Sequence, residues 1–185
     1  MNYCSQCGGP VALTVPPDDD RPRYVCPACG TVHYQNPKLV VGCIPIWEER
    51  ILMCRRNIEP RKGFWTLPAG FLENDETVAA GARRETFEET GSRVTDLAPY
   101  LMVDIVYIHQ IYMMYRCRLQ APDFHPTRES SEVKLVAEAE IPWDEIAFPV
   151  IEKTLHHYLL DWSTGRFSFR TDRIDAPPKS LQQKR

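Results

Sequence analysis

The chain lacks the features that would assign it to a membrane or to an export route. Within its 185 residues no stretch approaches the roughly 18 consecutive apolar residues that span a bilayer. The first residues, Met1–Cys4, contain neither the basic nor the apolar region of an export signal. Basic residues are also in the minority, since 22 Lys and Arg face 25 Asp and Glu, for a net charge of −3. No global basic field therefore attracts nucleic acid or anionic lipid, and we expect a cytoplasmic protein with no membrane partner.

The organisation of the chain is that of one ordinary domain with a small unit in front of it. Hydrophobic residues make up 43% of the chain and charged residues 25%, which is the balance of a globular protein. The sequence shows no internal repeat, and its character changes near Asn36–Lys38. We expect three parts: a small unit over residues 1–34, the main domain over 35–170, and a poorly ordered polar tail over 171–185.

Strands mixed with two substantial helices are predicted for the main domain. Leu39–Ile44 and Ile51–Cys54 have the pattern of a hairpin across a polar turn. Residues 76–90 contain no proline and are followed by Gly91, which predicts a helix and its end. A second, amphipathic helix is predicted over 149–161. Further strands are predicted at 94–106, 111–119 and 133–137. This mixture indicates an α/β or α+β core.

Seven cysteines need an explanation other than disulfides, because disulfide frameworks are typical of exported proteins. Cys4 and Cys7 form one Cys-x2-Cys pair, and Cys26 and Cys29 form a second pair 18 residues later. This is the ligand spacing of a four-cysteine structural Zn²⁺ site, which stabilises segments too short to build a core. Two redox dithiols are the competing interpretation, but no βαβ pattern surrounds either pair. The other cysteines lie in apolar runs and are predicted to be buried thiols: Cys43, Cys54 and Cys117.

A small zinc unit can also bind nucleic acid. The three aspartates at 18–20 are matched only by Arg21 and Arg23, which makes a poor basic footprint. We therefore expect a structural or dimerising role for this unit, and no nucleic-acid partner.

The segment from Gly70 to Ser92 concentrates carboxylates at helical spacing. Glu85, Glu88 and Glu89 stand at i, i+3 and i+4, which puts them on one helix face. Like charges at this spacing repel one another unless a cation lies between them, and Mg²⁺ accepts such oxygen ligands. A solvated acidic face, with Arg84 paired incidentally to Glu88, is the alternative.

The wider pattern resembles the Nudix box. Its charged and glycine positions are all present at the family's spacing: Gly70, Glu76, Arg84, Glu85, Glu88, Glu89 and Gly91. Thr86 and Ser92 depart from it, since the family usually has aliphatic residues at these packing positions. Ala69 also replaces a common glycine in the lead-in that precedes the box.

The resemblance implies a Nudix α/β/α sandwich with a mixed sheet, preceded by a zinc ribbon, and a loop–helix–loop that holds one to three Mg²⁺ or Mn²⁺ ions against a diphosphate. It implies that Glu85, Glu88 and Glu89 bind the metal and that Glu85 also helps to deprotonate the attacking water. Arg84 is then expected to orient Glu85, and Glu76 to support the loop.

Two further groups of residues are candidates for the site. Family members often recruit a carboxylate beyond the box, and Glu129 and Glu132 are the candidates here, with a polar surface turn as the alternative. Trp65, Tyr107 and Tyr112 offer aromatic faces that could stack on a base, although core packing is the competing role. His109 alone indicates neither a ligand nor a base.

The substrate is indicated less sharply. NADH pyrophosphatases carry an SQPWPFP-like stretch after the box, and residues 97–115 contain none. From about residue 2 to 170 the chain most resembles plant-type FAD pyrophosphatases, for instance at Tyr34–Lys38 and Trp65–Gly70. This implies cleavage of FAD to FMN and AMP, with ADP-ribose as a close rival because both carry an ADP moiety.

Other functions compete with this diphosphatase. A non-catalytic nucleotide sensor would tend to have lost glutamates of the box, and this chain keeps them all. A nucleoside triphosphate sanitiser would be separated by its products. RNA-cap removal finds no basic surface in its favour. The family resemblance implies a homodimer.

Overall fold

The computed structural model describes residues 1–177 of the chain, which divides into two compact units, Met1–Pro37 and Lys38–Arg185. Within the described residues, no helix combines the length and the apolar character needed to cross a membrane. Residues 178–185, which complete the tail expected from the sequence, lie outside the described residues.

The first unit is a three-stranded antiparallel sheet joined to two tight turns. Its strands are β1 (Ala12–Thr14), β2 (Arg23–Val25) and β3 (Val32–His33), in that order. Each Cys-x2-Cys pair forms a turn closed by the following glycine: Gly8 donates its N–H to Cys4, and Gly30 donates its N–H to Cys26. The unit has almost no apolar core, because only Cys4, Pro16 and Cys26 are buried among its described residues.

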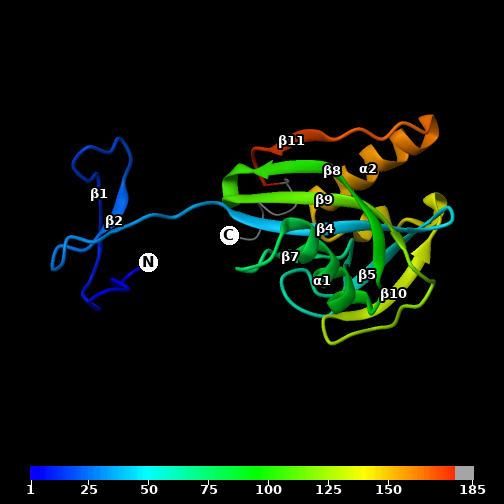
Figure 1. The fold of residues 1–185 in the computed structure, drawn as a ribbon, viewed down its shortest axis with the longest axis horizontal. Helices are drawn as coiled ribbons and strands as arrows, with labels where there is room; N and C mark the ends of the chain where they lie inside the picture. Colours follow the sequence, from blue (N-terminus) through cyan, green and yellow to red (C-terminus); the bar gives the residue numbers. More distant parts are fainter. Residues whose placement is uncertain (178–185) are drawn as a thin grey trace. The chain divides into compact units, whose positions relative to one another are not determined.

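The second unit is built on one mixed sheet with the order β10-β5-β4-β9-β8-β11 (Figure 1). Two short strands extend it, β6 beside β5 and β7 beside β4. The pairs β4–β9 and β8–β11 are parallel and the others are antiparallel. The strands are β4 (Lys38–Trp47), β5 (Arg50–Arg56), β6 (Trp65–Thr66), β7 (Ala69–Phe71), β8 (Val94–Ile105), β9 (Gln110–Leu119), β10 (Ser130–Val136) and β11 (Arg170–Ile174). The predicted hairpin is confirmed, with Ile46 opposite Ile51.

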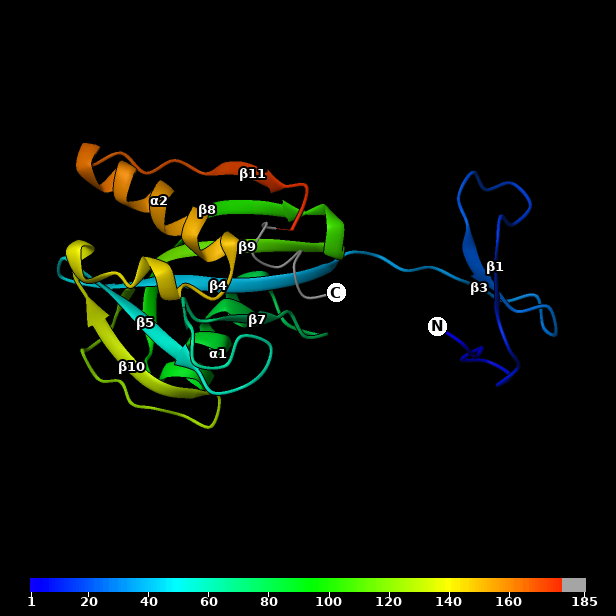
Figure 2. The ribbon, with the colours of Figure 1, turned by 180° about the vertical axis from the view of Figure 1, so that it is seen from behind.

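Two helices cover opposite faces of this sheet (Figures 1 and 2). Helix α1 (Val78–Thr90) contributes Ala82 to a cluster around Val41, Leu52 and Cys117. Helix α2 (Pro149–Thr164) contributes its apolar stripe to a larger cluster on the other face. Three short 3-10 turns complete the unit: η1 (Val106–Ile108), η2 (Glu138–Glu140) and η3 (Trp143–Glu145). The α/β/α sandwich with a mixed sheet is confirmed, as is the burial of the three cysteines predicted to be core thiols.

Helix α1 begins and ends with ordinary capping chemistry. The Thr77 side chain accepts a hydrogen bond from the N–H of Ala80 at 3.1 Å. At the other end Gly91 has φ of 74° and donates its N–H to Phe87. The two departures from the family pattern are buried polar residues with satisfied hydroxyls. Thr86 donates to the carbonyl of Ala82, and Ser92 to that of Asp123, each at 2.8 Å.

The expected polar tail is a correction, because its first residues form β11. This strand pairs with β8, and its polar side chains meet a polar stripe of α2. Asp172 accepts hydrogen bonds from Lys153 at 2.8 Å and His157 at 2.9 Å, and Arg170 pairs with Asp161. Ion pairs hold the strand in place, so its sequence carries no apolar alternation by which it could have been recognised. The Gly- and Pro-rich stretch before α1 contains the short strands β6 and β7.

Candidate active site

Arg84 is the centre of a cluster of carboxylates on α1. Its Nη1 donates to Glu85 at 2.7 Å and to Glu88 at 2.9 Å. Its Nε and Nη2 donate to both oxygens of Glu76, and Nη2 also reaches the carbonyl of Phe71. A planar guanidinium with this many charge-assisted bonds holds its partners in fixed directions. This is the geometry that the expected orienting role of Arg84 requires.

The loop before α1 approaches the helix closely at Gly70. A β-carbon at this position would lie 2.2 Å from Oε2 of Glu85, so no larger residue fits while Glu85 keeps its position. Glu76 joins the loop to the helix as well, because it accepts the N–H of Glu73 at 2.8 Å while it binds Arg84. The glycine and the glutamate of the pattern therefore place the same carboxylate.

Glu89 lies deepest in the cluster. It is 5% exposed and accepts hydrogen bonds from the Ala69 N–H at 3.1 Å and the Cys54 thiol at 3.7 Å. Burial raises its pKa to about 8, and the charge of Glu85 acts in the same direction. Burial also raises the pKa of Glu85, against the opposing effect of Arg84. Carboxyl groups with raised pKa values in one site are suited to proton transfer.

These carboxylates line a cavity of about 580 Å³, a size typical of small-molecule sites. Its walls come from segments far apart in the sequence, including β4, β5, β9, α1 and the start of α2. The acidic residues of the lining are Glu59, Glu73, Glu85, Glu88, Glu89 and Glu129. The large apolar and aromatic residues of the lining are Ile58, Phe71, Ile105, Tyr107, Ile108, Tyr112, Phe148, Ile151 and Ile174. One cavity thus combines an acidic surface with an apolar one.

The structure separates the two candidate carboxylates beyond the box. Glu129 lines the cavity and contributes to raising the pKa of Glu85. Glu132 does not line it and instead lies 3.7 Å from Nη1 of Arg55. The register of β10 against β5 shifts between Ser130 and Glu132, and such an irregularity redirects side chains. Glu129 therefore joins the cluster and Glu132 does not.

The three aromatic candidates divide in a similar way. Tyr107 and Tyr112 line the cavity, and burial raises the pKa of Tyr112 to about 12. Trp65 is 3% exposed, belongs to the core on the α2 face and does not line the cavity. The Nζ atom of Lys134 lies 4.2 Å from the centre of its ring. The competing role, core packing, is the one that the structure gives Trp65.

Arg56 is a cavity residue that the sequence analysis did not single out. It is half-buried at the end of β5, donates to the carbonyl of Pro60 at 2.9 Å and lies over the ring of Phe148. Within the part of the chain that the structure describes, no carboxylate lies within ion-pair distance of it. Its charge nevertheless acts on Glu89 and Tyr112 across the cavity. No motif marks Arg56, because the fold alone brings it to face α1.

The four paired cysteines converge in the first unit. Their sulfur atoms all lie within 4.8 Å of one another, with Cys4 to Cys29 at 3.7 Å and Cys7 to Cys26 at 3.5 Å. Thiolates at about 2.3 Å from a tetrahedral Zn²⁺ lie about 3.8 Å apart, so the donor set fits this ion. His33 adds a contact of 3.3 Å to the sulfur of Cys4.

Comparison with known proteins assigns both units to one family. Residues 36–158 match the family model of the NUDIX domain, and residues 2–35 match a zinc-ribbon model described as Nudix N-terminal. A crystal structure of a NUDIX hydrolase from Nitrosomonas europaea is 49% identical, with a TM-score of 0.91, over 95% of this chain and 100% of that chain. An ADP-ribose pyrophosphatase from Streptococcus suis is 21% identical with a TM-score of 0.57, over 75% of this chain and 100% of that one, a likeness of fold alone.

Curated relatives with a named activity are more distant. The NAD-capped RNA hydrolase NudC of Photobacterium profundum is 26% identical over 162 residues, which are 84% of this chain and 58% of that protein. The NudC of Vibrio parahaemolyticus is 26% identical over 168 residues, 87% of this chain and 62% of that protein. The chain thus spans about six tenths of the length of these relatives. Both of these relatives are named for the hydrolysis of NAD-capped RNA.

Proposed function

The chain belongs to the Nudix family of hydrolases, and we propose that it cleaves the diphosphate linkage of a nucleoside diphosphate derivative with the help of Mg²⁺ or Mn²⁺. The observation that supports this proposal best is the α1 cluster, in which Arg84 fixes Glu85 and Glu88 beside the buried Glu89 at the wall of a cavity. We propose FAD as the substrate, cleaved to FMN and AMP, with ADP-ribose as its rival.

The donor atoms of this cluster suit a hard divalent cation. Glu85, Glu88, Glu89 and Glu129 offer only oxygen, which Mg²⁺ prefers. Glu89 is buried, which disfavours its charged form, and a bound cation would stabilise that form. Among residues 1–177, only the cysteine cluster brings three or more ligand atoms within 4.8 Å of one another. The oxygen atoms of the cavity glutamates are therefore spaced more widely than the cysteine sulfur atoms. Such a spacing suits Mg²⁺, which keeps several waters and binds through few carboxylates. When bound, such an ion neutralises diphosphate charge and lowers the pKa of water.

The protein's own residues supply position and proton transfer. Arg84 restricts Glu85 to one orientation, and Gly70, which has no side chain, leaves room for the Glu85 carboxylate in that orientation. Arg84 holds the Glu85 carboxylate at the wall of the cavity, and we assign it the proton of the attacking water. Arg56 faces the carboxylates and can donate to a phosphate oxygen without giving up an ion pair.

Recognition of the rest of the substrate falls to the apolar lining. Tyr107 and Tyr112 can stack on a flat ring or pack against it. We place in this cavity the adenosine diphosphate moiety that FAD and ADP-ribose share, and the names of the curated relatives add a NAD cap on RNA as a third candidate. A cap is also a dinucleotide with an internal diphosphate, so the same cluster would act on it.

For the zinc ribbon we propose a structural Zn²⁺ held by the four cysteines. The unit has hardly any core of its own, and the sulfur atoms already lie at distances that suit a tetrahedral ion. The ion would therefore supply the stability that packing does not.

A substrate panel tests the proposal directly. FAD, ADP-ribose, NADH, NAD⁺, 8-oxo-dGTP and a NAD-capped RNA are each incubated with Mg²⁺ or Mn²⁺, and the products are resolved by chromatography. FMN and AMP formed from FAD well ahead of the other reactions supports our choice, and fastest turnover of ADP-ribose or of the capped RNA replaces it. No turnover of any member with either metal contradicts the enzymatic reading and favours a nucleotide sensor.

A matched pair of variants tests the cluster itself. Glu88→Gln removes one carboxylate charge that faces the cavity and should lower kcat by orders of magnitude without loss of fold. Glu138→Gln, in η2 and outside the cavity lining, should leave kcat unchanged. Near-full activity of Glu88→Gln would remove the basis of the metal assignment.

A further inference from the structure

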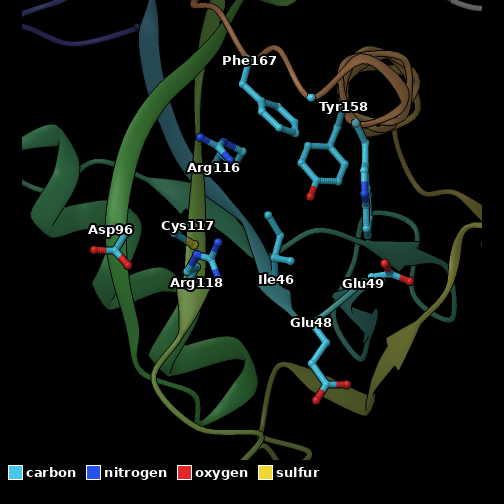
Figure 3. Close-up of a pocket in the computed structure, with 11 residues that line it drawn as sticks. Ile46, Glu48, Glu49, Asp96, Arg116, Cys117, Arg118, Tyr158 and Phe167 are labelled. Carbon is cyan, nitrogen blue, oxygen red and sulfur yellow. The ribbon is translucent and has the colours of Figure 1, made fainter.

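A second cavity of about 520 Å³ lies on the α2 face of the sheet (Figure 3). It lies where β4 and β9 end, whereas the catalytic cavity lies where these two strands begin. It is bounded by the ends of β4 and β9, by the last turns of α2 and by the segment that follows this helix. It shares no lining residue with the catalytic cavity. Whatever this second cavity binds therefore has a site of its own.

Tyr158 presents an unpartnered hydroxyl to the second cavity. Its side chain is 2% exposed, and Figure 3 shows the hydroxyl pointing into the space below the aromatic ring. Within residues 1–177 it has no hydrogen-bond partner, whereas the hydroxyl of Tyr100 donates to Asp161 at 2.8 Å. No side-chain oxygen or nitrogen of the described residues is both enclosed and without a partner, so the Tyr158 hydroxyl is accessible from the cavity and can bond a ligand there.

Two arginines supply positive charge at the same place. Arg116 and Arg118 lie two residues apart on β9 and so share one face of the sheet. The guanidinium of Arg116 lies 4.0 Å from the centre of the Phe167 ring, which fixes its position. Neither arginine has a carboxylate within ion-pair distance among the described residues. Burial raises the pKa of Tyr158 to about 12 against the opposing charges of both arginines, so the hydroxyl stays protonated as a donor at neutral pH.

Acidic and aromatic groups complete the lining and restrict what can enter. Glu48, Glu49 and Asp96 also line this cavity, and in Figure 3 the carboxylate of Glu48 points away from the arginines. Carboxylates accept hydrogen bonds from hydroxyl and amino groups, and they repel a long polyanion. Trp162, beside Tyr158, adds an aromatic surface for a flat ring.

We propose that the second cavity is a binding site for a nucleoside monophosphate. The phosphate is held by Arg116, Arg118 and the hydroxyl of Tyr158, the base packs on Trp162, and hydroxyl or amino groups donate to the acidic rim. A single phosphate matches two guanidinium groups and one hydroxyl, and the rim disfavours longer phosphate chains and nucleic acid. This assignment goes beyond the proposed hydrolysis and does not depend on it.

Calorimetric titration of the full chain with AMP in metal-free buffer containing EDTA tests the site. Tyr158→Phe is the sharpest variant, because it keeps the ring and removes only a hydroxyl without a protein partner. It should leave the melting temperature unchanged and weaken AMP binding by about tenfold or more, as expected for the loss of one hydrogen bond to a charged group. Arg118→Ala should weaken it at least as much.

Two controls separate this site from the catalytic cavity and from general loss of charge. Arg56→Ala alters the catalytic cavity alone and should leave this AMP binding intact. Arg93→Ala removes an arginine stacked on an aromatic ring elsewhere, at 5.1 Å from the centre of Phe87, and should also have no effect. Absence of AMP binding in EDTA, or wild-type affinity in both Tyr158→Phe and Arg118→Ala, would overturn the proposal. Inorganic phosphate that binds as tightly as AMP would overturn the nucleoside part.

Discussion

Replacing Gly70 with alanine should disable the site while leaving the fold in place. The new β-carbon would lie 2.2 Å from Oε2 of Glu85, and ordinary contact begins at 3.4 Å. The carboxylate must therefore move by about 1.2 Å (3.4 − 2.2), since the neighbouring loop is held by Glu76. A displacement of this size at a reacting group costs on the order of a hundredfold in rate, or about 2.7 kcal/mol in transition-state stabilisation. Gly70 has no positive φ, so alanine meets no backbone strain there.

The assay is kcat/KM on the best substrate of the panel, together with the melting temperature of each protein. Gly91→Ala is the matched control. Its β-carbon would also meet a side chain at 2.2 Å, that of His125, but outside the cavity, and φ at Gly91 is 74°. This variant should lose stability, by about 1 kcal/mol or more, and retain the kcat of its folded fraction. Wild-type activity of Gly70→Ala, or equal loss of stability and activity in both variants, would refute this reasoning.

Three further predictions concern the ribbon, the last strand and the additional carboxylate. Cys26→Ser should lower the melting temperature of the ribbon while kcat at saturating Mg²⁺ changes little. An unchanged melting temperature in calorimetry would contradict a structural ion. Hydrogen bonds from His157 and then Lys153 hold the pKa of Asp172 below its ordinary value of 3.8, so the stabilisation is complete above this pH and is lost as the pH falls below it. Asp172→Asn should thus cost about 1–2 kcal/mol in denaturant unfolding at pH 7 and progressively less below pH 3.8, and a gap independent of pH would exclude this ion-pair origin. Glu129→Gln should lower kcat by roughly ten- to a hundredfold while Glu132→Gln does not, and the reverse order would exchange their roles.

The sequence predicted those helices and strands whose own residues carry the usual marks of their structure, such as capping residues or apolar alternation. Helix α1 carries a capping residue before it and a glycine after it, and the β4–β5 hairpin alternates around a polar turn. Strand β11 was missed because its partners lie on α2, where Lys153, His157 and Asp161 recur every four residues. Such a strand is recognised only when both elements are placed, since neither shows an apolar stripe facing the other.

The residues of the candidate site also differ in how far the sequence predicts them. The glutamates of α1 follow from helical periodicity and from the family pattern, because one rigid element carries them all. Glu129 and Glu132 could not be ranked from the sequence, because which of them lines the cavity depends on where β10 begins and how it pairs with β5. Trp65 was a candidate only as an aromatic residue, and its burial depends on the packing of α2. Arg56 could not be predicted from the periodicity of the sequence, since a single arginine at the end of a strand forms no repeating pattern.

The two cavities lie on either side of a buried contact between α2 and the sheet. Alternate residues of β9 face this helix, and Met114, in the middle of the strand, is fully buried in the same core cluster as Leu155 of α2. Val150 and Ile151 near the start of α2 line the catalytic cavity, and Tyr158 and Trp162 near its end line the second one. Tyr112 then lines the catalytic cavity and Arg116 the second one. A larger side chain at Met114 should disturb both cavities, whereas changes at Arg116 should be felt in one, so the buried contact between them keeps the two sites structurally separate.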